Sequence, residues 1–175
     1  MNQRGFGITG WKNSGKTTLT ERLVAELTAR GWRISTVKHA HHHFDIDKEG
    51  TDSFRHRAAG ASEVAIVSGN RWALMHELRD EQEPSLDTIL DRLAPCDLVL
   101  VEGYKREPHT KIEARRTGAK NREPLSDGDP NIVAIAADHA VESHLPVFDL
   151  DDVAAIADFV VERMGLRRQS NVRPD

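Results

Sequence analysis

Near its amino end the chain reads Gly10-Trp11-Lys12-Asn13-Ser14-Gly15-Lys16-Thr17. Two glycines separated by four residues and followed by Lys and then Ser or Thr form the pattern of a phosphate-binding loop. Glycines let the backbone wind closely around an anion, so that N–H groups converge on phosphate oxygens at a helix N-terminus. This stretch therefore predicts a nucleotide-binding loop between a strand and a helix.

The sequence on either side of the loop has the order that this motif requires. A short β-prone run from Phe6 to Thr9 precedes it. Apolar residues follow it at helical spacing: Leu19, Leu23, Val24 and Leu27. An ordinary strand-to-helix connection is the competing interpretation, and the order of strand, glycine loop and helix disfavours it.

Length and composition bound the class of protein. The 175 residues suffice for one α/β domain and are few for two. The formal net charge of −4 provides no basic field for nucleic acid or an anionic membrane. We therefore expect residues 1–165 to form a nucleotide-binding domain and residues 166–175 a flexible C-terminal tail.

Location is predicted from what the sequence lacks. Cys96 is the single cysteine, which excludes an internal disulfide. The first residues lead into the first predicted strand without room for an export signal, and apolar runs are far shorter than the roughly 20 residues of a membrane-spanning helix. We expect a cytoplasmic protein that binds neither nucleic acid nor membrane.

Strand and helix patterns alternate along the chain. Strands are predicted at 33–38, 98–101, 132–136 and 146–148, and helices at 51–61, 86–93 and 153–161. The segments 63–68 and 71–76, joined at Gly69-Asn70, are typical of a strand pair with a two-residue turn. The pattern predicts an α/β fold: a three-layer P-loop NTPase fold with a mainly parallel sheet flanked by helices.

The loop supplies most of the candidate ligands. Lys16 is expected to bind the β- and γ-phosphates and Thr17 to lie beside Mg²⁺. The predicted nucleotide contacts of the loop are Gly10, Asn13, Ser14, Gly15, Lys16, Thr17 and Thr18. The strand 98–101 is followed by Glu102, which is predicted to be an acidic ligand of the magnesium site, with a solvated strand-end glutamate as the alternative.

A polar segment between the second strand and the next helix concentrates histidine and aspartate. It contains His39, His41, His42, His43, Asp45, Asp47 and Asp52. A metal site, a lid and a partner surface all remain open, although the spacings of strong zinc motifs are absent. Asp52 opens the next helix as either a metal ligand or an N-cap, and Asp45 or Asp52 is a candidate for orienting a hydrolytic water.

These residues resemble the molybdopterin-guanine dinucleotide biosynthesis protein B (MobB) family, accessory proteins of molybdenum cofactor maturation. The resemblance rests on residues 10–18, Val37-Lys38-His39, Phe44-Asp45, Asp47, Asp52-Ser53, Arg55, Arg57, Ala59-Gly60-Ala61, residues 101–105 and Lys111-Ile112-Glu113. The chain departs from the family pattern at Thr51, where Lys is frequent, and at Thr110, where Pro is frequent. Because of both departures, the sequence does not determine the charge that surrounds the phosphates.

The resemblance implies a GTP-binding protein with weak GTPase activity, usually a homodimer, which assists the molybdopterin guanylyltransferase that attaches GMP to molybdopterin. It implies that Lys16 and Thr17 hold phosphate and Mg²⁺. Asp52 and Glu102 then complete the metal site. Lys105 and Lys111 are implied to lie near the nucleotide or the partner.

Recognition of the base is less determined, because the Asn-Lys-x-Asp signature of many GTPases is absent. Asp138 follows the apolar run from residue 132 to 137, where it is a candidate acceptor for guanine or a turn cap. Arg55 and Arg57 are candidates for stabilising charge on a phosphate, with surface ion pairs as the alternative.

Three other functions stay open. One is an ATP-dependent small-acid ligase or kinase related to dethiobiotin synthetase. Another is a nickel-insertion GTPase, favoured by the histidine segment. The last is an interaction module with a degenerate nucleotide site.

Overall fold

The computed structural model describes residues 5–40, 44 and 46–167. The chain forms two compact units, one made of residues 1–39 together with 86–175 and the other of residues 40–85. The larger unit is therefore discontinuous in sequence, with the smaller one inserted after its second strand. The boundaries predicted for a single domain and its tail stay a prediction.

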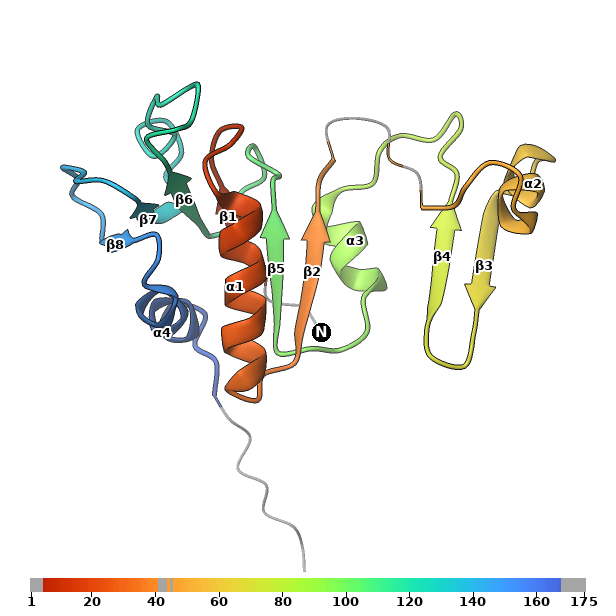
Figure 1. Ribbon diagram of the computed structural model, residues 1–175, viewed down its shortest axis with the longest axis horizontal. Helices are drawn as coiled ribbons and strands as arrows, with labels where there is room; N and C mark the ends of the chain where they lie inside the picture. The colour runs from red at the N-terminus through yellow and green to blue at the C-terminus, as the bar shows by residue number, and fades with distance from the viewer. Residues whose placement is uncertain (1–4, 41–43, 45, 168–175) are drawn as a thin grey trace, which may run out of the picture. The chain divides into compact units, whose positions relative to one another are not determined.

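The larger unit is built on a six-stranded sheet in which every pairing is parallel, in the order β2-β5-β1-β6-β7-β8 (Figure 1). Its strands are β1 (Gly5–Thr9), β2 (Ile34–Lys38), β5 (Leu98–Glu102), β6 (Lys111–Arg115), β7 (Ile132–Ala137) and β8 (Val147–Asp149). Parallel strands end at the same edge, so this order brings the loop after β1 next to the ends of β5 and β6. The predicted α/β class is confirmed.

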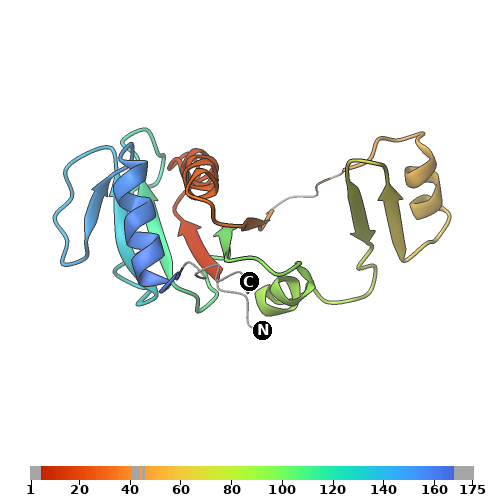
Figure 2. The same ribbon diagram turned by 90° about the horizontal axis from the view of Figure 1, so that it is seen from below.

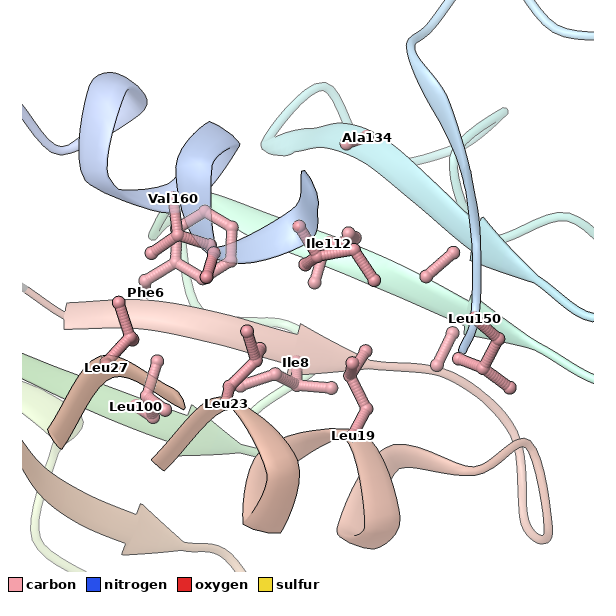
Figure 3. Packing of buried hydrophobic residues seen from close by; sticks show 14 of the residues in the cluster. Phe6, Ile8, Leu19, Leu23, Leu27, Leu100, Ile112, Ala134, Leu150 and Val160 are labelled. Carbon is pink, nitrogen blue, oxygen red and sulfur yellow. The ribbon is translucent and has the colours of Figure 1, made fainter. Parts of the chain in front are cut away.

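Helices cover both faces of this sheet (Figure 2). Helices α1 (Lys16–Ala29) and α4 (Val153–Arg163) pack on one face, and α3 (Leu86–Arg92) packs on the other. Leu19, Leu23 and Leu27 of α1 meet Phe6 and Ile8 of β1 in the larger core (Figure 3). Burial of each such side chain contributes roughly 1.5–3 kcal/mol, so the core fixes the helix that follows the glycine loop.

Strand β6 is an element that the sequence analysis did not predict. Lys111 and Glu113 lie in it, almost completely buried, where an apolar pattern is expected. The Lys111 ammonium lies 2.5 Å from the Asp129 carboxylate and donates to the Lys105 carbonyl oxygen at 3.0 Å. The charges buried in this strand are thus paired. Because they stand where apolar residues are expected, the sequence pattern does not predict the strand.

The Glu113 carboxylate ties the segment after β6 to the strand. It pairs with Arg115 at 2.7 Å and accepts hydrogen bonds from the backbone N–H groups of Leu125 (3.0 Å) and Ser126 (3.1 Å). These three donors satisfy a carboxylate that is almost completely buried. Lys111 and Glu113 therefore hold the 116–130 segment in place.

The smaller unit consists of α2 (Asp52–Ala58) and the antiparallel pair β3 (Glu63–Val67) and β4 (Trp72–His76). The backbone N–H of Ser68 donates to the Arg71 carbonyl oxygen at 2.9 Å, which closes the predicted turn. Arg57 pairs with Asp47 at 2.5 Å and with Glu77 at 2.9 Å. The predicted helix and strand pair are confirmed. Arg57 forms ion pairs, which was the alternative to a role in stabilising charge on a phosphate.

Among the helices of the described residues, none has the length and apolar content needed to cross a membrane.

We predict that the buried pair Lys111–Asp129 is strongly coupled. Asp129→Leu should destabilise the protein by about 3 kcal/mol, because it leaves a buried ammonium without its counter-ion. Lys111→Met should lower the free energy of unfolding by a smaller amount, because the Asp129 side chain still reaches water. In urea unfolding, the double variant should lose clearly less free energy of unfolding than the two single variants lose together. The exposed pair Arg22–Asp151 is the matched control, and equal coupling at both sites would contradict this account.

Candidate functional site

The glycine loop adopts a conformation that depends on its sequence. Gly10 has φ 147°, Asn13 φ 65° and Gly15 φ 91°, all in the region that L side chains rarely adopt. A Cβ on Gly10 would collide with Ser14 Oγ and lie 2.5 Å from the Ala114 carbonyl oxygen. The tight turn therefore requires glycine at its first position.

Helix α1 begins directly behind this turn. Gly15 is its N-cap and supplies no side-chain hydrogen bond, and the first turn holds no acidic residue. The N-cap therefore offers the first N–H groups no side-chain acceptor, and no acidic residue of the first turn itself offsets the positive end of the helix dipole. The side-chain oxygen of Ser14 is buried without a hydrogen-bond partner in the described structure. These features fit an anion bound in the loop.

Lys16 places its ammonium over the loop, where it donates to the Trp11 carbonyl oxygen at 2.6 Å. Burial lowers the pKa of Lys16, and the nearby ammonium of Lys105 lowers this pKa further. Glu102 acts in the opposite direction, and Lys38 adds to the lowering. The cations at this edge of the sheet therefore repel one another, and a bound phosphate would relieve that repulsion.

Glu102 forms the acidic part of the site. It ends β5 and is 8% exposed, and its Oε1 accepts a hydrogen bond from Thr17 Oγ1 at 2.8 Å. The Lys38 ammonium lies 3.2 Å from the same oxygen. A hydroxyl and a carboxylate are hard oxygen ligands of the kind that Mg²⁺ takes beside phosphate and water, so this donor pair fits that ion.

A small, partly open pocket lies beside the loop. Its lining includes Trp11, Ser14, Arg116, Asn121, Glu123 and His139. Trp11 Nε1 donates to the Glu123 carbonyl oxygen at 2.7 Å, and the Lys105 ammonium lies 4.1 Å from the centroid of the indole ring. Trp11 thus connects the phosphate loop to the segment after β6, a contact that the sequence analysis missed.

Comparison with known proteins places these features in a family. The family model "Molybdopterin guanine dinucleotide synthesis protein B" (MobB) matches residues 6–138, which include the loop, Lys38 and Glu102. This chain belongs to the MobB family. The resemblance predicted from its motifs is thereby confirmed.

Individual MobB relatives cover nearly the whole chain. The molybdopterin-guanine dinucleotide biosynthesis adapter protein of Escherichia coli K12 is 42% identical over 161 residues, 91% of this chain and 92% of the relative. The adapter protein of Haemophilus influenzae is also 42% identical, over 157 residues, 89% of this chain and 86% of its own length.

Solved MobB structures share the fold. Bacillus subtilis MobB superposes with a TM-score of 0.75 at 26% identity, covering 95% of this chain and 99% of that structure. A MobB protein homolog from Bacillus stearothermophilus gives a TM-score of 0.68 at 31% identity, covering 95% of this chain and all of that one.

The other predicted site residues of this MobB chain lie in several places. Asp138 accepts from the Thr117 backbone N–H (2.9 Å) and hydroxyl (3.1 Å), and from His139 (2.8 Å). The hydrogen bond from His139 is the largest cause of the lowered pKa of Asp138. These contacts make Asp138 a cap of the turn after β6, one of the two roles considered for it.

Asp47 and Asp52 of the polar segment belong to the smaller unit. Thr51 is the N-cap of α2 and accepts from the Phe54 backbone N–H at 3.4 Å, so the capping alternative for Asp52 is wrong. Asp45 and His41–His43 lie outside the described residues. Over the residues that are described, no group of three or more His, Cys, Asp and Glu side chains is arranged to hold a metal ion.

Lys38 was not predicted to be a site residue, although its position in the sequence carries the same signal as that of Glu102. Lys38 ends β2, as Glu102 ends β5, and the register pairs the two positions directly. The rule that selected Glu102, a charged residue at the carboxyl end of a predicted strand, applies equally to Lys38. Trp11 had no comparable signal, because its partners Lys105 and Glu123 lie far from it in the sequence.

We predict that Gly10→Ala lowers the free energy of unfolding by about 2 kcal/mol, because the new Cβ meets Ser14 and the Ala114 backbone at a disfavoured φ. Thermal unfolding followed by circular dichroism measures this loss. Gly128→Ala is the matched control, since a Cβ there would meet nothing within 4 Å. Equal melting temperatures for the two variants would contradict the geometry.

Proposed function

We propose that this chain is a Mg²⁺·GTP-binding adapter in the synthesis of molybdopterin guanine dinucleotide. The observation that carries the proposal is the contact of Thr17 with Glu102 beneath an uncapped helix N-terminus, in a member of the MobB family. Relatives at 42% identity are named as adapter proteins of this biosynthesis. The partner would be the molybdopterin guanylyltransferase, in the cytoplasm.

The proposed ligand set follows from the loop. Backbone N–H groups of residues 13–18 and the Lys16 ammonium would bind the phosphates, and Thr17 and Glu102 would hold Mg²⁺. Asp52 remains a proposed third ligand, supported by the family resemblance. The bound metal would supply neutralising charge to the phosphates.

The pocket beside Trp11 is the proposed place of the base. Guanine presents the acceptors O6 and N7 together with the donors N1 and N2, and the pocket wall combines Arg116 with Glu123. The capped turn held by Asp138 would shape this wall. Lys105, whose pKa is lowered chiefly by burial, contacts Trp11 and would lie between the base and the phosphates.

Hydrolysis of GTP would be slow. Lys16 would stabilise negative charge that develops on the transferred phosphoryl group, and Asp45 or Asp52 would orient the water. Arg57, one of the two arginines considered for this charge, is committed to Asp47 and Glu77. A weak GTPase that acts mainly through its bound state suits an adapter.

The smaller unit supports a homodimer. Val67 is opposite Trp72 and Ala65 is opposite Leu74 in the pair of strands, which places these side chains on one face. Val67 is 75%, Trp72 70% and Leu74 48% exposed. A two-stranded sheet alone is marginally stable in water, so a second copy covering this apolar face would stabilise it.

We predict micromolar GTP binding in the presence of Mg²⁺ that Lys16→Ala weakens at least tenfold, with ATP bound much more weakly by the unaltered protein. Equilibrium titration with fluorescent GTP, ATP and their diphosphates measures this. Lys48→Ala, an exposed lysine of the smaller unit, is the control. Equal or stronger ATP binding would instead favour the ligase or kinase related to dethiobiotin synthetase.

We predict that Trp72→Asp converts a dimer to a monomer, because a carboxylate on the apolar face cannot be desolvated against a second copy. Sedimentation equilibrium with and without the substitution tests this, with Arg79→Asp, at an exposed position three residues beyond the end of β4, as control. A protein that is monomeric before any substitution excludes the proposed dimer.

A further inference from the structure

One carboxylate oxygen at the proposed metal site has two donors. Oε1 of Glu102 accepts from the Thr17 hydroxyl at 2.8 Å and lies 3.2 Å from the Lys38 ammonium. Thr17 and Glu102 are the two proposed magnesium ligands of the larger unit. The Lys38 ammonium is therefore bound to the oxygen that a metal ion would need.

The fold brings Lys38 and Glu102 side by side. Strands β2 and β5 are neighbours, and their register places Lys38 directly beside Glu102 at the last position of each strand. Neighbouring strands lie roughly 4.8 Å apart, a span that a lysine side chain covers easily. The contact follows from strand pairing and needs no rearrangement of a loop.

The two partners differ in how firmly they are held. The Glu102 side chain is only 11% exposed, so its charge requires a cation nearby. The Lys38 side chain is 59% exposed, and its ammonium can return to water at little cost. The carboxylate is fixed, whereas its cation is replaceable.

The other two lysines at this edge have different contacts. Lys16 donates to the Trp11 carbonyl oxygen, and Lys105 lies over the Trp11 ring. Lys38 is thus the lysine whose ammonium forms the ion pair with Glu102 in the described structure.

We propose that Lys38 is an internal counter-ion that exchanges with Mg²⁺ at Glu102. In the nucleotide-free protein Lys38 neutralises the buried carboxylate. When Mg²⁺ and nucleotide bind, the metal replaces the ammonium, and the released Lys38 becomes available to the additional negative charge of a triphosphate. This inference rests on the proposed nucleotide site and extends it to metal regulation and to the discrimination of GTP from GDP.

The exchange predicts that removal of the Lys38 ammonium changes two measurable quantities together. Removal of the ammonium leaves the Glu102 oxygen open, so less Mg²⁺ is needed to support GDP binding. Removal also takes one cation from the triphosphate site, so the preference for GTP over GDP falls. A lysine that only stabilises the strand ends would not produce this combination.

The test uses Lys38→Met, the charge-conserving Lys38→Arg and the control Arg33→Met, which removes an exposed cation just before the amino end of the same strand. Binding of fluorescent GDP and GTP is titrated over a series of Mg²⁺ concentrations. Lys38→Met should lower the Mg²⁺ midpoint for GDP about three- to tenfold, as expected for loss of a partly exposed competitor, and reduce the GTP:GDP preference by a similar factor. Lys38→Arg and Arg33→Met should behave like the unaltered protein.

An unchanged or raised Mg²⁺ midpoint in Lys38→Met, with thermal unfolding showing a folded protein, would overturn the exchange. If the unaltered protein binds neither GTP nor GDP, the proposed function fails, and the exchange is judged separately with Mn²⁺ alone. Electron paramagnetic resonance should then show tighter Mn²⁺ binding by Lys38→Met than by the unaltered protein. Equal Mn²⁺ affinities would reject the exchange on its own terms.

Discussion

The contact between the Thr17 hydroxyl and the Glu102 carboxylate depends on most of the larger unit. Thr17 lies in the first turn of α1, which is fixed by the packing of Leu19, Leu23 and Leu27 on the sheet. Glu102 ends β5, which pairs with β1 so that the loop and the carboxylate meet at one edge. Parallel pairing and helix packing therefore bring together the residues of the proposed phosphate and metal site.

Much of this arrangement could be predicted from the sequence, because its signals are local. The glycine loop, the helical spacing after it and the apolar strand before Glu102 each lie within a few residues. Strand β6 could not be found in this way, since Lys111 and Glu113 interrupt its apolar pattern. Their partners, Asp129 and the backbone at 125–126, come later in the sequence, and only the folded chain shows that these charges are compensated.

In the candidate site, too, some residues could be predicted from local sequence, whereas one contact depends on the folded chain. Lys16, Thr17 and Glu102 were predicted from position, whereas the ion pair of Lys38 required knowledge that β2 and β5 are neighbours although they are far apart in sequence. The role of Asp138 was undecided between two alternatives because both place a carboxylate after a strand. Hydrogen bonds from Thr117 and His139 identify the capping contacts.

The most direct measurement is a crystal structure of the protein with Mg²⁺ and a non-hydrolysable GTP analogue. The account predicts phosphates in the loop of residues 10–17, with the metal bound through Thr17 Oγ1 and Glu102, directly or through one water. Nucleotide bound away from this loop, or a metal in contact with neither residue, would contradict it.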